Sequence, residues 1–254
     1  MNDRIALYGK KSDSLESLLR RLGFSPVTPE EDPEALILCY GGDGAMLGAE
    51  LRYPNRLKMP VRDCETAPHC PKHSLESQLL AMKNGQLRSS TLMKLQGTLG
   101  DMTRFAVNDV FIHNTNNVSA LRYQVKIDDD IYAREVVGDG VGVSTVHGST
   151  AYYRSITHGS FRVGIGIAFS NSTELLNHLV LQEDSVIKVR ILRGPSELVF
   201  DNSPEVTPLR EGDIVTIRKS DQVARMLGLD IFMCPECRRI RREQRANGYE
   251  DSTL

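Results

Sequence analysis

One apolar run constrains the fold of this chain more than any other feature. Residues 35–40 read Ala-Leu-Ile-Leu-Cys-Tyr and are followed at once by two glycines. A strand with one face in water alternates apolar and polar residues, whereas a strand covered on both faces is apolar throughout. The run therefore predicts a buried strand of a parallel sheet, and with it an α/β domain.

The neighbouring segments fit the same domain. Residues 4–8 form a second short apolar strand. Helical periodicity covers residues 12–22, 45–51 and 74–82. Within the first of these helices the leucines recur at the spacing of one helix face: Leu15, Leu18, Leu19 and Leu22. Strands that alternate with helices indicate an α/β fold for this part of the chain.

The pattern changes at about Ser90, after which strand-like runs follow one another closely. They cover residues 91–95, 106–113, 121–127, 131–137, 186–192, 198–200 and 214–218. Asp128-Asp129-Asp130 supplies a turn, and one helix is predicted near 149–157. We therefore predict an α/β domain over 1–89 and an all-β, β-sandwich-like domain over 90–229. After Leu229 the chain is helical and charged again.

Net charge and cysteine content indicate which partners and which cellular compartment to expect. The net charge is −2, which predicts no general attraction to nucleic acid or to an anionic membrane. The one basic run, residues 238–242, is interpreted as a solvated helix face. The N-terminus lacks the apolar stretch of a signal peptide, and no stretch is long enough to span a bilayer. We therefore expect a cytoplasmic protein with five reduced cysteines, of which Cys39 belongs to the core.

The first candidate site follows the buried strand directly. Gly41, Gly42 and Gly44 surround Asp43, and a helix is predicted to begin beside them. Glycines let the backbone approach a phosphate, and the N-terminus of a helix favours anions. Asp43 would then face the ligand. The alternative is a tight turn in which Asp43 only caps the helix.

Two further strings carry polar groups in unusual places. Asn108 and Asp109 interrupt an apolar strand pattern and offer a donor and acceptors for a ligand; the alternative is a bulge or a strand start facing water. Residues 139–153, Asp-Gly-Val-Gly-Val-Ser-Thr-Val-His-Gly-Ser-Thr-Ala-Tyr-Tyr, run from a strand through a loop of small residues into a helix. Such a loop can bind a base edge and leave room for a flat ring. The alternative is an ordinary loop with Ser149 or Thr150 as the helix N-cap.

Together the three strings resemble those of the NAD kinase family. That family carries GGDGT, an Asn-Glu pair and a DG…STPTGSTAY loop in this order, and the chain has GGDGAML, AVNDVFIHN and DGVGVSTVHGSTAY. GGDG by itself also resembles loops of lipid kinases and phosphofructokinases, whereas the STVHGSTAY loop resembles NAD kinases alone among these. The resemblance implies an α/β domain, a β-rich domain and a tail, here 230–254, that returns to the first domain.

The resemblance also implies roles for individual residues. Asp43 matches the aspartate that contacts the adenosine 2′-hydroxyl and acts as general base, and Asn108 and Asp109 match the dinucleotide-binding pair. The remaining dinucleotide-binding positions implied by the match lie in the glycine loop and in the third string: Gly41, Gly42, Gly44, Asp139, Ser144, His147, Thr150, Ala151 and Tyr152.

The chain departs from the family pattern at four places. Ala45 replaces the threonine of GGDGT, Asp109 replaces a glutamate, and Val146-His147 replaces Pro-Thr. The family's GRLGF string, expected soon after Pro60, is absent. The altered segment holds Cys64, His69, Cys70 and His73, and the tail holds Cys234-Pro-Glu-Cys237.

These soft ligands suggest a structural zinc site. A C-x-x-C pair is half of a common tetrahedral site, and a returning tail could bring the two clusters together. The first choice of ligands is all-thiolate, with His69 or His73 as a replacement for one of them: Cys64, Cys70, Cys234 and Cys237. The alternative is that these are unlinked residues of a loop and a tail.

The sequence thus predicts an NAD kinase that uses ATP or another phosphoryl donor, together with Mg²⁺ or another divalent cation. We expect a homo-oligomer whose partners are NAD and the donor, with no nucleic acid and no membrane. One alternative is a kinase of the same superfamily for a lipid or a nucleoside. Another is a catalytically impaired NAD(P)-binding sensor, which Ala45 and the absent GRLGF string would favour.

Overall fold

The computed structural model describes residues 3–250, with side chains described as far as residue 244. The chain divides into two compact units. The first unit contains residues 3–91 and 224–250, and the second contains residues 92–223. No helix within residues 3–250 combines the length and the apolar character needed to cross a membrane.

The first unit is built on a parallel sheet. Its strand order is β2 (Ser25–Val27), β1 (Arg4–Tyr8), β3 (Leu36–Tyr40), β4 (Leu57–Val61) and the last residues of β16 (Ile214–Leu227). The predicted buried strand is β3, which has a neighbour on each side. Strand β4 was not predicted because Lys58 and Pro60 interrupt its apolar pattern.

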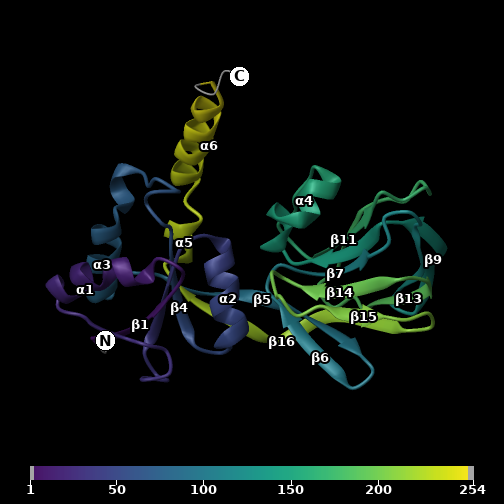
Figure 1. Cartoon of the computed structure of the whole chain (residues 1–254), viewed down its shortest axis with the longest axis horizontal. Coiled ribbons are helices and arrows are strands. Elements are labelled where there is room, and N and C mark those ends of the chain that lie inside the picture. The colour runs from purple at the N-terminus through teal and green to yellow at the C-terminus, as the bar shows by residue number, and fades with distance from the viewer. Residues whose placement is uncertain (1–2, 251–254) are drawn as a thin grey trace. The chain divides into compact units, whose positions relative to one another are not determined.

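Helices cover both faces of this sheet, as Figure 1 shows for α1 and α3 on one side and α2 on the other. The helices of this unit are α1 (Glu16–Arg21), α2 (Asp43–Arg52), α3 (Leu75–Lys83), α5 (Leu229–Phe232) and α6 (Pro235–Glu250), with short 3₁₀ turns at Ser12–Leu15 and Pro71–His73. One face packs Leu19 and Leu79 against Leu38, and the other packs Ala49 against Ile37. The α/β prediction is therefore confirmed.

A buried ion pair joins α2 to β4. The Nζ atom of Lys58 lies 2.6 Å from Oε2 of Glu50, and both side chains are almost fully buried. Lys58 also donates hydrogen bonds to the carbonyls of Tyr53 and Arg56. Removing one member of such a pair would leave a buried charge without its counter-charge, which is strongly destabilising. The pair therefore fixes the helix that begins at Asp43 against the sheet.

The second unit contains two antiparallel sheets. One includes the first part of β16, β13 (Ile187–Arg193), β8 (Leu121–Ile127) and β9 (Asp130–Gly138), with β5 (Ser89–Leu99) and β6 (Met102–Ala106) paired beside it. The other has the order β12 (Leu179–Leu181), β11 (Ile165–Ser170), β10 (Gly140–Ser144), β7 (Asp109–Asn114), β14 (Ser196–Phe200) and β15 (Thr207–Leu209). The predicted turn is confirmed, since Asp128 and Asp129 adopt positive φ.

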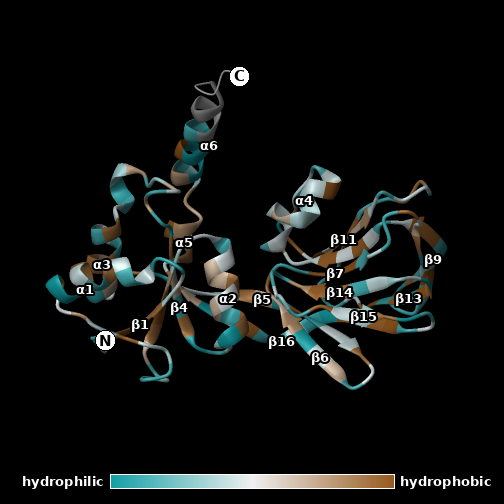
Figure 2. Cartoon of the chain, in the orientation of Figure 1, coloured by the Kyte–Doolittle hydropathy of each residue, from teal (hydrophilic) through white to brown (hydrophobic). Residues whose placement is uncertain are grey.

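Alternating apolar residues from both sheets form one core. It includes Tyr123 and Val189 of the first sheet and Val141, Ile167 and Phe200 of the second, all buried. In Figure 2 the strands of this unit carry brown segments between teal and white ones, whereas the described part of α6 is mostly teal. The β-sandwich-like prediction is thus confirmed, with helix α4 (Tyr152–Thr157) and a 3₁₀ turn at Gly148–Thr150 as the interruption.

Several predicted elements need correction. The strand predicted over 106–113 is two strands, since β6 ends at Ala106 and β7 begins at Asp109. Strand β11 was not predicted, although it is buried between β10 and β12. The basic run is not simply a solvated face, because Arg241 is partly buried while its neighbours Arg239 and Arg242 are exposed.

Candidate functional site

The glycine loop lies at the carboxyl edge of the parallel sheet. The N–H of Gly41 donates to the carbonyl of Val61 at 2.9 Å, which closes the ends of β3 and β4 together. Gly41 has φ +147°, and a Cβ there would stand 3.0 Å from that of Ala45. The backbone conformation therefore requires glycine at this position. Asp43 is the first residue of α2, so it stands where open α/β sheets bind ligands.

Asp43 does not cap its helix. The N-cap residue is Gly42, which makes no side-chain cap, and the carboxylate of Asp43 instead pairs with the guanidinium of Arg62. The two hydrogen bonds measure 3.0 Å from Nη1 to Oδ2 and 3.2 Å from Nη2 to Oδ1. This is a bidentate, charge-assisted contact. The side chain of Asp43 remains 52% exposed, and that of Arg62 is 12% exposed.

Residues of the C-terminal tail contact Arg62. The guanidinium carbon of Arg62 lies 3.8 Å from the centre of the Phe232 ring in α5, a cation–π contact. Arg241 of α6 is near enough to interact electrostatically with both Arg62 and Asp43. Burial, followed by the charge of Arg62, lowers the pKa of Arg241. The tail thus contributes positive charge and an aromatic ring beside the glycine loop.

The segment after β4, where the GRLGF string was expected, is held by hydrogen bonds and an ion pair to Asp63. Asp63 follows Arg62 and is buried, and it accepts hydrogen bonds from Tyr40 at 3.3 Å and from the N–H of Glu65 at 3.0 Å. Lys11, after β1, forms an ion pair with it at 3.3 Å. Burial works to raise the pKa of Asp63, but these donors outweigh it and the pKa is lowered. Asp63 therefore joins the ends of three strands at this edge.

In the second unit, an aspartate that the sequence analysis did not single out holds the Asn108–Asp109 turn. The carboxylate of Asp201 accepts backbone N–H groups from Val107 at 2.7 Å, Asn108 at 2.7 Å and Asp109 at 3.1 Å. These bonds replace strand pairing, which explains why the predicted strand is broken here. Asp201 itself has positive φ, at +49°. An aspartate ending a strand was the available sequence signal.

Burial dominates the chemistry of Asp109. Asp109 is buried, and burial, followed by the nearby charge of Asp201, raises its pKa to about 7. Burial also raises the pKa of Asp201 to about 6, against the opposing effect of its three N–H donors. Two carboxylates this close do not ionise independently. Asp109 can therefore carry a proton near neutral pH and act as a hydrogen-bond donor.

The STVHGSTAY loop packs against this turn. Ser144 pairs with Asp109 across β10 and β7, and the N–H of Thr145 donates to the carbonyl of Asn108 at 2.8 Å. A Cβ on Gly148 would stand 2.1 Å from that same carbonyl oxygen, so only glycine fits. The side chain that caps the following turn is Thr145, which accepts from the N–H of Gly148 at 3.0 Å. Ser149 and Thr150 are not the N-caps of α4.

The other predicted residues of this unit lie around an open cavity of about 560 Å³. Asp139 and Tyr152 line it together with His113 and Asn171, and Asn171 donates to the Asp139 carboxylate at 2.8 Å. Tyr152 packs edge-on against Phe111 at 4.5 Å. Burial lowers the pKa of His113, which favours a neutral ring. The aromatic residues of β7 were not among the predicted site residues.

The predicted residues therefore form three groups within their units. Asn108, Asp109 and Ser144 meet at the junction of β7 and β10, and Asp139 and Tyr152 share the cavity. Two buried polar atoms at the junction, Oδ1 of Asn108 and Oγ of Ser144, have no hydrogen-bond partner among the residues that the structure describes. Asp43 belongs to the other unit. Of the other predicted residues of the second unit, His147 is half-buried, and Thr150 and Ala151 are exposed.

Comparisons with known proteins point to one family. Residues 107–229 match the family model of the ATP-NAD kinase C-terminal domain. The chain is 23% identical over 210 residues to an NAD kinase of Clostridium perfringens. The aligned region covers 77% of this chain and 75% of the relative. It is 26% identical over 207 residues to an NAD kinase of Picrophilus torridus, covering 76% and 73%.

These matches support a divergent member of the NAD kinase family.

Solved structures show the same fold. An NAD kinase from Archaeoglobus fulgidus, crystallised in complex with ATP, superposes with a TM-score of 0.70 at 18% identity, covering 91% of this chain and 96% of that one. Yeast NADH kinase complexed with NADH superposes with a TM-score of 0.65 at 19% identity, covering 88% and 73%. The arrangement predicted from the sequence, a two-domain NAD kinase-like fold, is confirmed.

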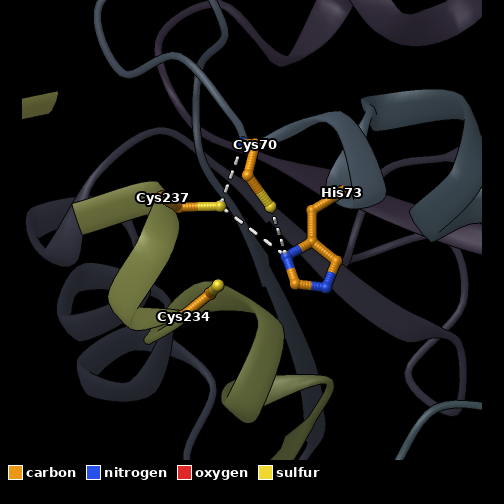
Figure 3. Close-up of side chains that lie close together, drawn as sticks. All are labelled: Cys70, His73, Cys234 and Cys237. Atoms are coloured by element: carbon orange, nitrogen blue, oxygen red, sulfur yellow. Dashed lines mark hydrogen bonds between the residues drawn. The ribbon is translucent and has the colours of Figure 1, made fainter. Parts of the chain in front are cut away.

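In the place of the family's GRLGF string this NAD kinase relative carries a thiol cluster. Four side chains point toward one another in Figure 3, two from the segment after β4 and two from the start of α6: Cys70, His73, Cys234 and Cys237. Their ligand atoms all lie within 4.8 Å of one another. Cys70 and Cys237 are buried, and the other two are half-buried.

The geometry does not include Cys64 in this group. Its exposed sulfur lies 3.5 Å from Nδ1 of His69, and the two form a separate pair. The set that the structure brings together is therefore three thiols and one imidazole, not four thiols. A signal was present in the sequence: Cys-Pro-Lys-His and Cys-Pro-Glu-Cys share the same spacing and the same proline, at positions 70–73 and 234–237.

The pKa values of the two thiols in the tail are shifted in opposite directions. Cys234 stands just before α6, and its pKa is lowered because hydrogen bonds from the N–H groups of Cys237 and Glu236 outweigh the effect of burial. Burial raises the pKa of Cys237 to about 11. Cys39, by contrast, is isolated in β3, where burial raises its pKa to about 12. The prediction that Cys39 is a core residue is confirmed.

Proposed function

We propose that the chain transfers a phosphoryl group from ATP to the adenosine 2′-hydroxyl of NAD, giving NADP. Membership of the NAD kinase family supports the reaction class. The curated relatives are named NAD kinases, and one similar structure holds ATP while another holds NADH. A cytoplasmic setting and a homo-oligomer remain part of this proposal.

One observation carries the proposal furthest. Oδ1 of Asn108 and Oγ of Ser144 are buried polar atoms without a partner in the described structure, and both lie in the segment that matches the family model. Leaving a buried acceptor or hydroxyl unsatisfied costs about 1–3 kcal/mol. A bound nucleotide would supply the missing partners. These two atoms therefore mark the place where we expect the dinucleotide to bind.

Asp109 would then act as a donor beside them. Its raised pKa lets it hold a proton near neutral pH and offer that proton to an acceptor on the dinucleotide. The open cavity lined by Asp139 and Tyr152 would receive another part of the same ligand, with the Tyr152 ring as a flat contact surface. Asn171 would hold Asp139 in position.

We assign the acid–base role to Asp43. As the bond to phosphorus forms, its carboxylate would accept the proton of the 2′-hydroxyl, while the N-terminus of α2 favours phosphate charge. The bidentate contact with Arg62 would orient this carboxylate toward the substrate hydroxyl.

A divalent cation would be held mainly by the phosphates of the donor. Among the described residues, the only group of three or more His, Cys, Asp or Glu ligands close enough to bind a metal is the thiol cluster. Sulfur ligands do not suit Mg²⁺, which prefers oxygen and usually combines a few carboxylates with substrate phosphates. Bound in this way, the cation would neutralise charge on the transferred phosphoryl group.

A specific observation favours a second candidate function, an impaired NAD(P)-binding protein. Arg62 already neutralises Asp43, and Ala45 supplies no hydroxyl to the glycine loop. In that case the dinucleotide would bind without being phosphorylated. A kinase for another alcohol, such as a lipid or a nucleoside, would instead show turnover without NAD.

Incubation of the purified protein with NAD, ATP and Mg²⁺, followed by detection of NADP with an NADP-specific dehydrogenase, tests the proposal. NADP formation above a blank without enzyme is the expected result. Binding of NAD by calorimetry without any NADP would favour the impaired candidate. Parallel reactions with NADH, polyphosphate, lipid and nucleoside acceptors distinguish the remaining alternatives.

A further inference from the structure

We propose that Cys70, His73, Cys234 and Cys237 bind one zinc ion, which clips the C-terminal tail to the first unit. The observation is the convergence in Figure 3 of two short segments that are more than 160 residues apart in the sequence. This site is separate from the proposed kinase activity and does not depend on it.

The spacing of the ligand atoms matches a tetrahedral ion. Zn–S bonds of about 2.3 Å and a Zn–N bond of about 2.05 Å place a sulfur and a nitrogen ligand about 3.5 Å apart. Nδ1 of His73 lies 3.4 Å from Sγ of Cys70 and 3.6 Å from Sγ of Cys237. All four ligand atoms lie within 4.8 Å of one another, so small side-chain movements close the set.

Both halves of the site are built in the same way. In each, a cysteine precedes a proline that starts a helical turn: Pro71 begins the 3₁₀ turn after Cys70, and Pro235 begins α6 after Cys234. The first turn of a helix leaves N–H groups free, and these stabilise a thiolate at its N-terminus. The second ligand stands three residues later, on the same side of that turn. Such a pair of turns is typical of structural zinc sites.

Further contacts fix the ligands. The backbone N–H of Cys70 donates to Sγ of Cys237 at 3.3 Å, which joins the two halves directly. Gln78 of α3 donates to the carbonyl of His73 at 2.8 Å and holds that turn. Outer-shell hydrogen bonds of this kind orient metal ligands. With two ligands buried and four protein ligands available, the site is closed, as structural rather than catalytic zinc sites are.

The surrounding charge suits a bound ion. Three thiolates outweigh the charge of Zn²⁺, so the occupied site would be negative overall. Arg241 stands one helical turn after Cys237 and interacts electrostatically with it, and its Nη1 is buried without a hydrogen-bond partner in the part of the chain that the structure describes. A negative zinc–thiolate centre would supply the missing counter-charge.

The ion would act as a staple for the tail. It would hold the start of α6, and with it the preceding helix α5, whose Phe232 ring packs on Arg62. Because a zinc site forms only in the folded protein, its binding free energy adds to the stability of the fold. Loss of the ion should therefore loosen the tail first.

Elemental analysis of the full-length protein, purified without added metal or chelator, gives the first test. We expect about one zinc per chain, and a melting temperature that falls by several degrees with a zinc chelator and recovers when zinc alone is restored. Replacement of the zinc by Co²⁺ should produce the thiolate-to-cobalt absorption of a tetrahedral sulfur-rich site. Metal-free protein whose melting temperature zinc does not change would overturn the proposal, and so would stoichiometric iron.

Two matched pairs of variants test the ligand set. His73→Ala and Cys237→Ser should lose most of the zinc, whereas His69→Ala and Cys64→Ser should keep it, because the latter two residues lie next to the site and outside it. Since Cys237 is buried and its variant can fail to fold, the half-buried His73 decides the outcome. Retention of zinc by His73→Ala together with its loss from Cys64→Ser would replace the proposed set by the all-thiolate one.

Discussion

The two units treat their key carboxylates in opposite ways. Asp43, at the carboxyl edge of the parallel sheet, is half-exposed and paired with Arg62. Asp109, between two antiparallel strands, is buried beside Asp201, and its pKa rises to about 7. The same side chain is therefore set up as a charged acceptor in one unit and as a potential proton donor in the other. The environment, and not the residue type, assigns the role.

The difference follows from how each fold exposes its functional positions. A parallel sheet ends in an open edge of loops and helix N-termini, where a carboxylate keeps contact with water and with cations. The turn between β6 and β7 is instead covered by the loop that contains Thr145 and Gly148. There the backbone N–H groups are taken by Asp201, and Asp109 is left without them.

The largest expected effect comes from removing the charged acceptor. Asp43→Asn keeps the shape of the side chain but cannot accept the hydroxyl proton, so turnover should fall by about a hundredfold or more while NAD binding survives. Steady-state kinetics and calorimetry measure the two quantities. Glu16→Gln, another exposed carboxylate of the same unit, is the control and should behave as wild type. Near-normal turnover of Asp43→Asn would remove the assigned role.

Removing the unsatisfied Asn108 side chain of the second unit should weaken NAD binding and not turnover. Asn108→Ala removes the buried Oδ1 atom, and NAD affinity should weaken by about 1–3 kcal/mol through the lost hydrogen bonds. Calorimetry of a variant with an unchanged melting temperature is the measurement. Asn84→Ala, at the exposed C-cap of α3 in the first unit, serves as the control and should keep its NAD affinity. Unchanged affinity in the folded Asn108 variant would place the dinucleotide elsewhere.

The buried carboxylate predicts a pH dependence of stability. Because the folded-state pKa of Asp109 is raised to about 7, its favourable contribution is complete below its unfolded pKa, near 4, and is lost as the pH rises through 7. Asp109→Asn cannot ionise, so between pH 5 and pH 8 the variant should lose about 2–3 kcal/mol less unfolding free energy than the wild type. Urea unfolding at the two pH values tests this. Equal pH dependence in both proteins would mean that Asp109 ionises normally.

The smallest effect should come from the partner of Asp43. Arg62→Gln removes a partly exposed ion pair, whose contribution to stability is about 1 kcal/mol or less. If Arg62 orients the base, turnover should drop only several-fold, with little change in the KM for NAD. The kcat and KM values of this variant decide between the two candidate functions, because a rise in turnover would show that Arg62 restrains Asp43.

Local sequence patterns were sufficient for much of the fold. The apolar run at 35–40 predicted β3, since only a strand covered on both faces tolerates such a run. The same reasoning failed for β11, because Gly166 and Ala168 separate its large residues and a glycine weakens the prediction of a strand. Its glycine is required by neighbouring rings: a Cβ on Gly166 would stand 2.3 Å from Phe161. That requirement cannot be read from one strand alone.

For the candidate site, too, some features followed from the sequence and others only from the tertiary structure. Sequence motifs by themselves determined the family, the loop that presents Asp43, and the polar residues Asn108 and Asp109, because glycine spacing and strand interruptions are local properties. Only the tertiary structure decided that Arg62 pairs with Asp43 and that His73, not Cys64, joins the thiol cluster. The physical reason is that pairing, burial and ligand geometry depend on distances between segments far apart in the chain, and packing alone fixes those distances.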